Sequence, residues 1–222
     1  IIKKMKRQIK LFDPIIDNNE LDILNKTLKS KFWADGSGNN QVKFFEEKFQ
    51  KIIKSDFNIA VNSGTSALYL ALSMEDIKDK EVILPSMTFV STAHSVITNN
   101  AKPVFADIDL DTLCIDPDKI EESTTKSTKI ILPVHFGGLS CDLTKIKKIC
   151  NTNNLTLIED AAHAVGSYYK DKPIGSHGKF VCFSFHPVKN LAMPTGGLIS
   201  INEKNGKKMR EMFLPEEGCK WG

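Results

Sequence analysis

The chain has 222 residues, of which 41% are hydrophobic and 26% charged, and its formal net charge is +3. This composition predicts a folded globular protein, and lysines spread along the chain give no indication of nucleic-acid binding. There is no apolar run long enough for a membrane span or a signal peptide, so we expect a cytoplasmic protein.

Cysteine and histidine spacing gives no indication of a metal site. The five cysteines include no CxxC pair, and the five histidines include no HExxH motif. We therefore expect reduced, mostly buried thiols and no bound metal.

Two helices are predicted before the main part of the chain. Asn18–Lys29 has an amphipathic pattern, and Gln41–Lys54 places Phe45, Phe49 and Ile52 on one face. The DGSGNN segment between them is expected to be a loop.

From Asp56 onward, short apolar runs rich in β-forming residues alternate with helical patterns, as in a parallel sheet covered by helices. The predicted strands are Asn58–Asn62, Glu81–Leu84, Pro103–Asp107, Lys129–Val134, Leu155–Glu159, Phe180–Phe185 and Gly197–Ile201. The predicted helices are Thr65–Ser73, Ser91–Thr98, Asp116–Glu122, Asp142–Asn151 and, at the end, Asn202–Met212. The pattern predicts an α/β domain with a mostly parallel, seven-stranded sheet and helices on both faces.

The segment NSGTSAL places Gly64, Thr65 and Ser66 where a strand ends and a helix begins. Free backbone N–H groups and the positive end of the helix dipole make such a position suitable for a phosphate. The alternative is a simple helix N-cap. The segment lacks the P-loop lysine and the GxGxxG spacing, so it does not indicate a nucleoside triphosphate or dinucleotide site.

The segment LIEDAAHAVG places Glu159 and Asp160 at the carboxyl end of a predicted strand, where open α/β sheets bind ligands. A carboxylate there can hold a protonated ring nitrogen by a charge-assisted hydrogen bond. The alternatives are that Asp160 caps a following helix and that Glu159 makes a structural contact.

The segment FSFHPVKN places Ser184 and Lys189 on a turn that leaves a strand. Burial at the edge of a sheet can lower the pKa of a lysine until its neutral amine attacks an aldehyde. The alternative is an ordinary surface lysine.

These segments resemble the DegT/StrS family of nucleotide-sugar aminotransferases, which use pyridoxal 5'-phosphate (PLP). The resemblance covers roughly Phe32 to Ser200 and rests on NSGTSAL, PSMTFVSTA, PVFADID, PVHFGGLSCDL, IEDAAHAVGSYYKDKPIGSHG and FSFHPVKN in this order. It implies the large domain of an aspartate-aminotransferase-like fold.

The resemblance also implies a role for each site residue. Lys189 is expected to form the Schiff base with PLP and to shuttle a proton, and Asp160 to pair with the ring nitrogen. Expected phosphate ligands are Gly64, Thr65, Ser66 and Ser184. His163 is expected near the phenolic oxygen of PLP, and Phe89 on the face of its ring, with a core position as the alternative for Phe89.

The implied reaction transfers an amino group from glutamate to a nucleotide-linked keto sugar, with the 4-position favoured, in surface-polysaccharide or lipopolysaccharide synthesis. The alternatives are a truncated, non-catalytic PLP-fold protein and a PLP-dependent sugar dehydratase. Related dehydratases carry histidine in place of the lysine, so Lys189 favours transamination and His186 is expected to be a supporting or packing residue.

The resemblance further implies a homodimer and a smaller domain in the sequence beyond Gly222, so we expect these 222 residues to lack that domain. We expect a tail and helix over residues 1–35, the PLP-binding large domain over 36–202, and the start of a linker over 203–222. The stretch LAMPTGG after Lys189 departs from the usual family wording, so the loop there is expected to have its own shape.

Overall fold

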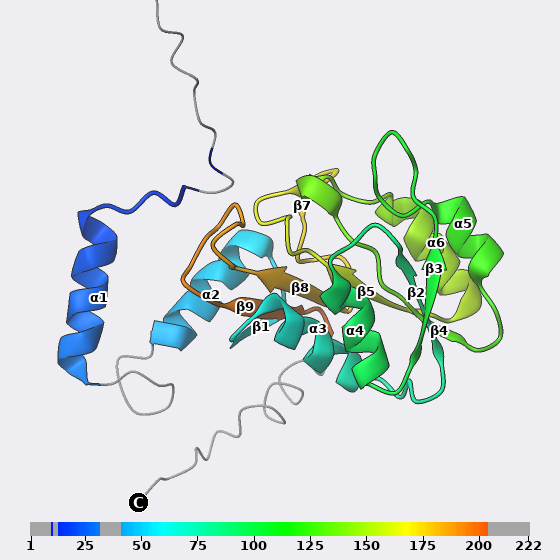
Figure 1. Cartoon of the computed structure of the whole chain (residues 1–222), viewed down its shortest axis with the longest axis horizontal. Helices are drawn as coiled ribbons and strands as arrows, with labels where there is room; N and C mark the ends of the chain where they lie inside the picture. The colour runs from blue at the N-terminus through cyan, green and yellow to red at the C-terminus, as the bar shows by residue number, and fades with distance from the viewer. Residues whose placement is uncertain (1–9, 11–12, 32–40, 204–222) are drawn as a thin grey trace, which may run out of the picture.

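A computed structural model of the chain describes residues 10, 13–31 and 41–203 (Figure 1). Its α-helices are α1 (Asn18–Ser30), α2 (Gln41–Ile53), α3 (Gly64–Ser73), α4 (Val90–Thr98), α5 (Pro117–Ser123) and α6 (Leu143–Asn153). The strands of the main sheet are β1 (Phe57–Val61), β2 (Glu81–Pro85), β3 (Lys102–Ala106), β4 (Thr128–Ile131), β5 (Thr156–Asp160), β8 (Phe180–Ser184) and β9 (Gly197–Ile201).

The seven strands form one sheet in the order β1-β9-β8-β5-β4-β2-β3. Strand β9 pairs antiparallel with both β1 and β8, and all other pairings are parallel. Every predicted strand is present, with ends that move by at most three residues. The prediction of a mostly parallel, seven-stranded sheet is therefore confirmed.

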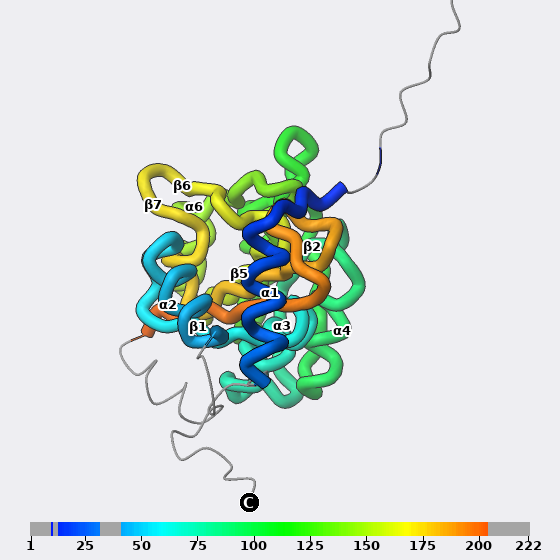
Figure 2. Tube along the Cα trace, turned by 90° about the vertical axis from the view of Figure 1, so that its left-hand side faces the viewer, coloured from blue at the N-terminus to red at the C-terminus, as the bar shows by residue number. Residues whose placement is uncertain are grey.

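Helices cover both faces of this sheet because its strands are apolar on both sides (Figures 1 and 2). Val82 and Leu84 pack in the core below α3 and α4, whereas Ile83 between them packs in the core that α2, α5 and α6 cover. Alternation along each strand thus builds two cores, as the sequence pattern predicts.

Helix α1 begins with a full capping box, in which Asp17 accepts the N–H of Asn19 and Glu20 accepts the N–H of Asp17. It buries none of its residues, and the side chains of Leu21, Leu24 and Leu28 are exposed. Across residues 10, 13–31 and 41–203, no helix is both long and apolar enough to cross a bilayer.

Two short elements are absent from the sequence prediction. They are the 3₁₀ turn η1 (Phe136–Gly138) and the hairpin of β6 (Tyr168–Tyr169) and β7 (Lys172–Pro173). Two-residue strands show no periodicity. Contacts distant in sequence support the segment that follows the hairpin, because Ser200 Oγ and Asn202 Nδ2 both donate to the carbonyl of Gly175.

Three sequence predictions lie wholly or largely outside the described residues. They are the DGSGNN loop, the helix expected over Asn202–Met212, of which only positions 202 and 203 are described, and the start of a linker over 203–222, of which only position 203 is described. Asn202 follows the end of β9 and does not begin a helix in the described part.

The direction of the strands determines where a ligand site can form. Strands β1, β5 and β8 run in the same direction, so Val61, Asp160 and Ser184 end at the same edge of the sheet. Strand β9 begins at this edge with Gly197, opposite both Val61 and Ser184. Polar groups from segments far apart in sequence therefore meet there.

Candidate active site

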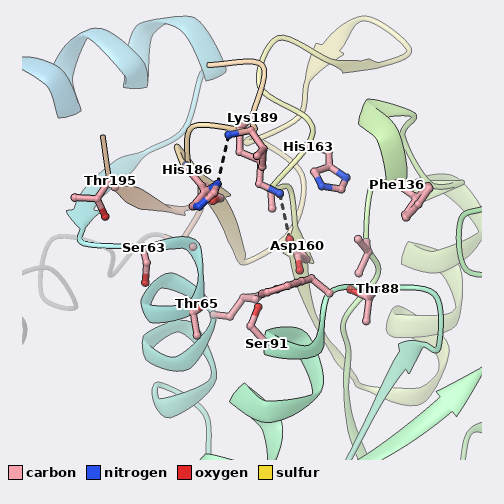
Figure 3. Close-up of a pocket in the computed structure, with 18 residues that line it drawn as sticks. Ser63, Thr65, Thr88, Ser91, Phe136, Asp160, His163, His186, Lys189 and Thr195 are labelled. Atoms are coloured by element: carbon pink, nitrogen blue, oxygen red, sulfur yellow. Dashed lines mark hydrogen bonds between the residues drawn. The ribbon is translucent and has the colours of Figure 1, made fainter. Parts of the chain in front are cut away.

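A cavity of about 280 Å³ lies at this edge of the sheet (Figure 3). Seven of the eight predicted site residues line it: Gly64, Thr65, Phe89, Asp160, His163, Ser184 and Lys189. They come from the start of α3, the segment before α4, the ends of β5 and β8, and the loops after those strands. The tertiary fold therefore brings together residues that lie up to 125 positions apart in the sequence, from Gly64 to Lys189.

Helix α3 directs its first residues toward this cavity. Ser63 is the N-cap; its hydroxyl accepts the N–H of Ser66 at 3.1 Å and its carbonyl accepts the N–H of Ala67 at 3.0 Å. Gly64 and Thr65 line the cavity wall, with the positive end of the helix dipole behind them.

Ser66 is the predicted phosphate ligand that does not lie on the cavity wall. Its hydroxyl donates to Asn62 Oδ1 at 2.5 Å and lies 3.0 Å from the hydroxyl of Ser63. The side chain of Ser66 therefore serves the cap of α3, and Ser63, which the sequence reading did not select, lines the cavity. The N-cap alternative describes this serine pair correctly.

Gly64 allows α3 to approach the end of β8 closely. A Cβ atom at this position would lie 3.2 Å from the Oγ of Ser184 and only 2.7 Å from its Cβ, and the second distance is shorter than Cβ contacts in proteins. The absence of a side chain at Gly64 thus brings the start of the helix and the serine hydroxyl to the same end of the cavity.

Asp160 is buried at the end of β5, with 5% of its surface exposed. Its Oδ2 accepts the hydroxyl of Thr92 at 2.9 Å, and its Oδ1 accepts the N–H of Ala162 at 3.1 Å. The carboxylate caps a turn, and no α-helix follows β5 directly, so the helix-cap alternative is wrong.

Lys189 lies half-buried in the loop between β8 and β9. Burial lowers the pKa of its amine, and the nearby charge of Asp160 offsets part of this effect. Within the described residues, Lys189 forms no ion pair. These properties differ from those of an ordinary surface lysine and favour the neutral amine.

The loop that carries Lys189 is held at several points. Lys189 donates its N–H to the carbonyl of His186 at 2.8 Å, and Thr195 Oγ1 donates to the carbonyl of Asn62 at 2.8 Å. The exposed His186 supports this turn, since its Nδ1 accepts the N–H of Val188 at 3.3 Å. Its expected supporting role fits this geometry, and its expected packing role does not.

His163 lies on the cavity wall beside Lys189 and Asp160 (Figure 3). Its Nδ1 accepts the N–H of Gly137 at 3.3 Å, so in the neutral ring Nε2 carries the proton. Burial lowers the pKa of His163, and the charge of Lys189 lowers it further. Among the described residues the Nε2–H of His163 has no hydrogen-bond acceptor, and such a neutral donor suits a contact with an oxygen anion.

Phe89 is not a core residue, because 72% of its surface is exposed. It precedes α4 as its N-cap residue and lines the cavity. The core alternative is therefore wrong, and an aromatic face is available to a flat ligand. Leu68, Val134 and Phe136 add apolar surface to the cavity walls.

Glu159 points away from the cavity, to the opposite face of β5 from Asp160. Its Oε2 lies 2.7 Å from Nε2 of His135, and both side chains are fully buried. Its other oxygen accepts the N–H of Gly178, while His135 Nδ1 accepts the N–H of Cys141. Glu159 thus makes a structural contact, as expected.

Sequence reasoning did not select several polar residues of the site. Four hydroxyl residues line the cavity: Ser63, Thr88, Ser91 and Thr195. Thr92 does not line it but donates a hydrogen bond to Asp160, which does. Thr88, Ser91 and Thr92 all lie within or beside the PSMTFVSTA segment, but hydroxyl residues are too common for this to be a signal without the fold. In the part of the chain described, no cluster of three or more His, Cys, Asp or Glu side chains could hold a metal ion.

Comparison with known proteins identifies the kind of site. Residues 14–220 match the DegT/DnrJ/EryC1/StrS aminotransferase family. The chain belongs to this family. The aminotransferases of this family are PLP-dependent, so the cofactor that the sequence predicts is confirmed at the level of the family.

Individual relatives are similar to this chain in sequence and in structure. The spore coat polysaccharide biosynthesis protein SpsC of Bacillus subtilis is 43% identical over 203 residues, which cover 90% of this chain and 51% of SpsC. The PLP form of the sugar aminotransferase Spr1654 of Streptococcus pneumoniae, described as putative, superposes with a TM-score of 0.85 at 29% identity and covers 93% of this chain and 57% of that one. Helicobacter pylori PseC, an aminotransferase involved in the biosynthesis of pseudoaminic acid, superposes with a TM-score of 0.86 at 27% identity, covering 92% and 55%.

These structures confirm the predicted aminotransferase-type fold of the chain. The chain spans about half the length of the curated relatives that it matches.

The residues of the cavity suit PLP chemically. The close approach of Gly64 to Ser184 and the start of α3 form a polar end for a phosphate, and a buried carboxylate and a half-buried amine, those of Asp160 and Lys189, both line the cavity. The exposed face of Phe89 and the apolar walls suit a flat aromatic ring. The cavity volume is close to the lower end of the range of about 300–1,000 Å³ for small-molecule sites.

Proposed function

We propose that this chain forms the cofactor-binding part of a PLP-dependent aminotransferase that acts on a nucleotide-linked keto sugar. The observation that carries the proposal is the cavity, in which Lys189, Asp160, His163 and the start of α3 lie together. We place the site in a large domain of residues 36–202, between an N-terminal helix and a linker.

Each residue has a distinct part in the proposed reaction. When bound, PLP supplies an electron sink that stabilises negative charge on the carbon bearing the amino group. Lys189 holds the cofactor through its Nζ and, when released, moves a proton to and from this carbon. Its lowered pKa favours the neutral amine that both tasks require.

The remaining residues orient the cofactor. Asp160 keeps the ring nitrogen protonated, and His163 donates Nε2–H to the phenolic oxygen. Gly64, Thr65 and Ser184 hold the phosphate together with Ser63, and Phe89 covers one face of the ring. Ser63 is assigned to the phosphate instead of the expected Ser66 because, of these two serines, only Ser63 lines the cavity.

We further propose glutamate as the amino donor, amination at the 4-position of the sugar, and a homodimer in the cytoplasm, in surface-polysaccharide or lipopolysaccharide synthesis. The polysaccharide biosynthesis named for SpsC and the sugar aminotransferase named for Spr1654 support the substrate class.

Borohydride trapping tests the proposal. The protein is incubated with PLP, reduced with borohydride and digested, and the modified lysine is identified by mass spectrometry. We expect the adduct on Lys189 and its loss in Lys189→Arg.

Lys147 provides a matched control lysine. Burial also lowers its pKa, but it lies away from the cavity and its Nζ is 3.4 Å from Nδ1 of His177. Lys147→Arg should leave the adduct on Lys189 unchanged. An adduct that forms mainly on Lys147, or one that persists in Lys189→Arg, would remove Lys189 from the proposed role.

A further inference from the structure

Thr92 is a fully buried hydroxyl residue in α4 that contacts the site without lining the cavity. Its Oγ1 lies 2.9 Å from Oδ2 of Asp160, 68 positions away in the sequence. It also lies 2.8 Å from Oγ1 of Thr88, which does line the cavity. A short row of hydroxyl groups thus leads from the cavity wall to the carboxylate.

The direction of these hydrogen bonds follows from their chemistry. An ionised carboxylate only accepts hydrogen bonds, so Thr92 gives its single hydroxyl proton to Asp160. The oxygen of Thr92 then accepts from Thr88, whose hydroxyl must be the donor in this pair. Each bond in such a chain polarises and strengthens the next.

The two donors to Asp160 fix the plane of its carboxylate. Rotation about the last side-chain bond of aspartate is broad, so the backbone alone does not set this plane. Thr92 holds Oδ2 from α4, and the N–H of Ala162 holds Oδ1 from the turn after β5. Each oxygen of the carboxylate is therefore held by a different element of the fold.

We propose that Thr92 is a positioning residue that orients the carboxylate of Asp160 toward the ring nitrogen of PLP, and that Thr88 supports it from the cavity side. The inference rests on the function proposed above, because it needs Asp160 to face the ring nitrogen. It adds a residue that touches neither cofactor nor substrate and acts through Asp160.

Three variants of α4 test this inference. Thr92→Val removes the hydroxyl and nearly keeps the shape of the side chain, and Thr92→Ser keeps the hydroxyl. Thr98→Val makes the same substitution as the first variant six residues further along α4, where the hydroxyl bonds to the carbonyl of His94. Thr92→Ala is measured in place of Thr92→Val if the valine variant does not fold.

The first readout is the dissociation constant of PLP, measured by titrating the apo-protein and following the absorbance of the bound cofactor. Loss of a hydrogen bond to a charged group should weaken binding by about tenfold in Thr92→Val. Thr92→Ser should stay within about twofold of the parent protein, and Thr98→Val should not change.

The second readout is the ¹⁵N resonance of ring-labelled PLP, which reports the protonation of the ring nitrogen. It should shift toward the unprotonated position in Thr92→Val and return in Thr92→Ser. A purely structural role for Thr92 would change stability in urea without moving this resonance.

The outcomes separate this inference from the function on which it rests. Normal PLP affinity and an unmoved ¹⁵N resonance in a folded variant that lacks the Thr92 hydroxyl would overturn the inference alone. A parent protein that binds no PLP, or that carries the borohydride adduct elsewhere than on Lys189, would overturn the proposed function and the inference with it.

Discussion

Replacing Gly64 with alanine should test whether the close approach of α3 to β8 builds the phosphate end of the cavity. The new Cβ would start 2.7 Å from the Cβ of Ser184 and 3.3 Å from its Cα. Carbon atoms pack at about 3.5–4.0 Å, so the helix and the strand must separate by about 1 Å.

Two opposing effects decide the sign of the change in stability. Alanine favours helix formation over glycine and restricts the unfolded chain, which together stabilise by at most about 1 kcal/mol. Overpacking costs about 1–3 kcal/mol. Ser184 is paired with Gly197 of β9 and is held in the sheet. The close contact with the new Cβ must therefore be relieved mainly by a movement of the start of α3.

We therefore expect Gly64→Ala to lower the free energy of unfolding by about 1–2 kcal/mol and to weaken PLP binding by about tenfold. Urea unfolding of the apo-protein measures the first effect, and absorbance titration with PLP measures the second. Displacement of the helix start from Ser184 is the common cause of both.

A double variant provides the control. Ser184→Gly removes the Cβ that the new alanine meets, so Gly64→Ala should cost about 1 kcal/mol less in that background. A Gly64→Ala variant that is as stable as the parent protein and binds PLP equally well would refute this role of Gly64. Additive effects of the two substitutions on the free energy of unfolding would refute it as well.

Three further substitutions give separate tests. Asp160→Asn should slow transamination by at least about a hundredfold, on the order of 3 kcal/mol, while the borohydride adduct still forms; near-normal turnover would show that another group serves the ring nitrogen. The pKa of His163 in the folded protein is lowered from its ordinary value of 6.5. As the pH falls below 6.5, His163 is therefore protonated in the unfolded chain before it is protonated in the folded one, and the folded protein loses stability. The urea midpoint should therefore fall more steeply with decreasing pH in the parent protein than in His163→Gln, and equal slopes would contradict this assignment. Glu159→Leu should destabilise the fold by about 2–6 kcal/mol, because it leaves buried N–H donors of His135 and Gly178 without an acceptor; a loss below about 1 kcal/mol would show that this contact is not structural.

The sequence alone predicted the type of fold and most of the selected residues that line the cavity. Alternating apolar residues on both sides of the strands, as at Val82 and Ile83, require helices on both faces of the sheet. Polar residues at strand ends, such as Asp160 and Ser184, must then meet at one edge because parallel strands end together. These rules are local or periodic, so they can be read without coordinates.

Only the tertiary structure decided which polar side chains face the cavity. Two serines of one motif, Ser63 and Ser66, differ in role because the N-cap geometry turns one toward the cavity and engages the other with Asn62. Thr92 reaches Asp160 only because α4 packs across the sheet, and sequence spacing carries no trace of a contact over 68 positions. The exposure of Phe89 likewise depends on the start of α4, since an aromatic residue in an apolar segment reads equally well as core. Strand and helix patterns are set by neighbours along the chain, whereas side-chain partners across elements are set by packing, which a single sequence does not display.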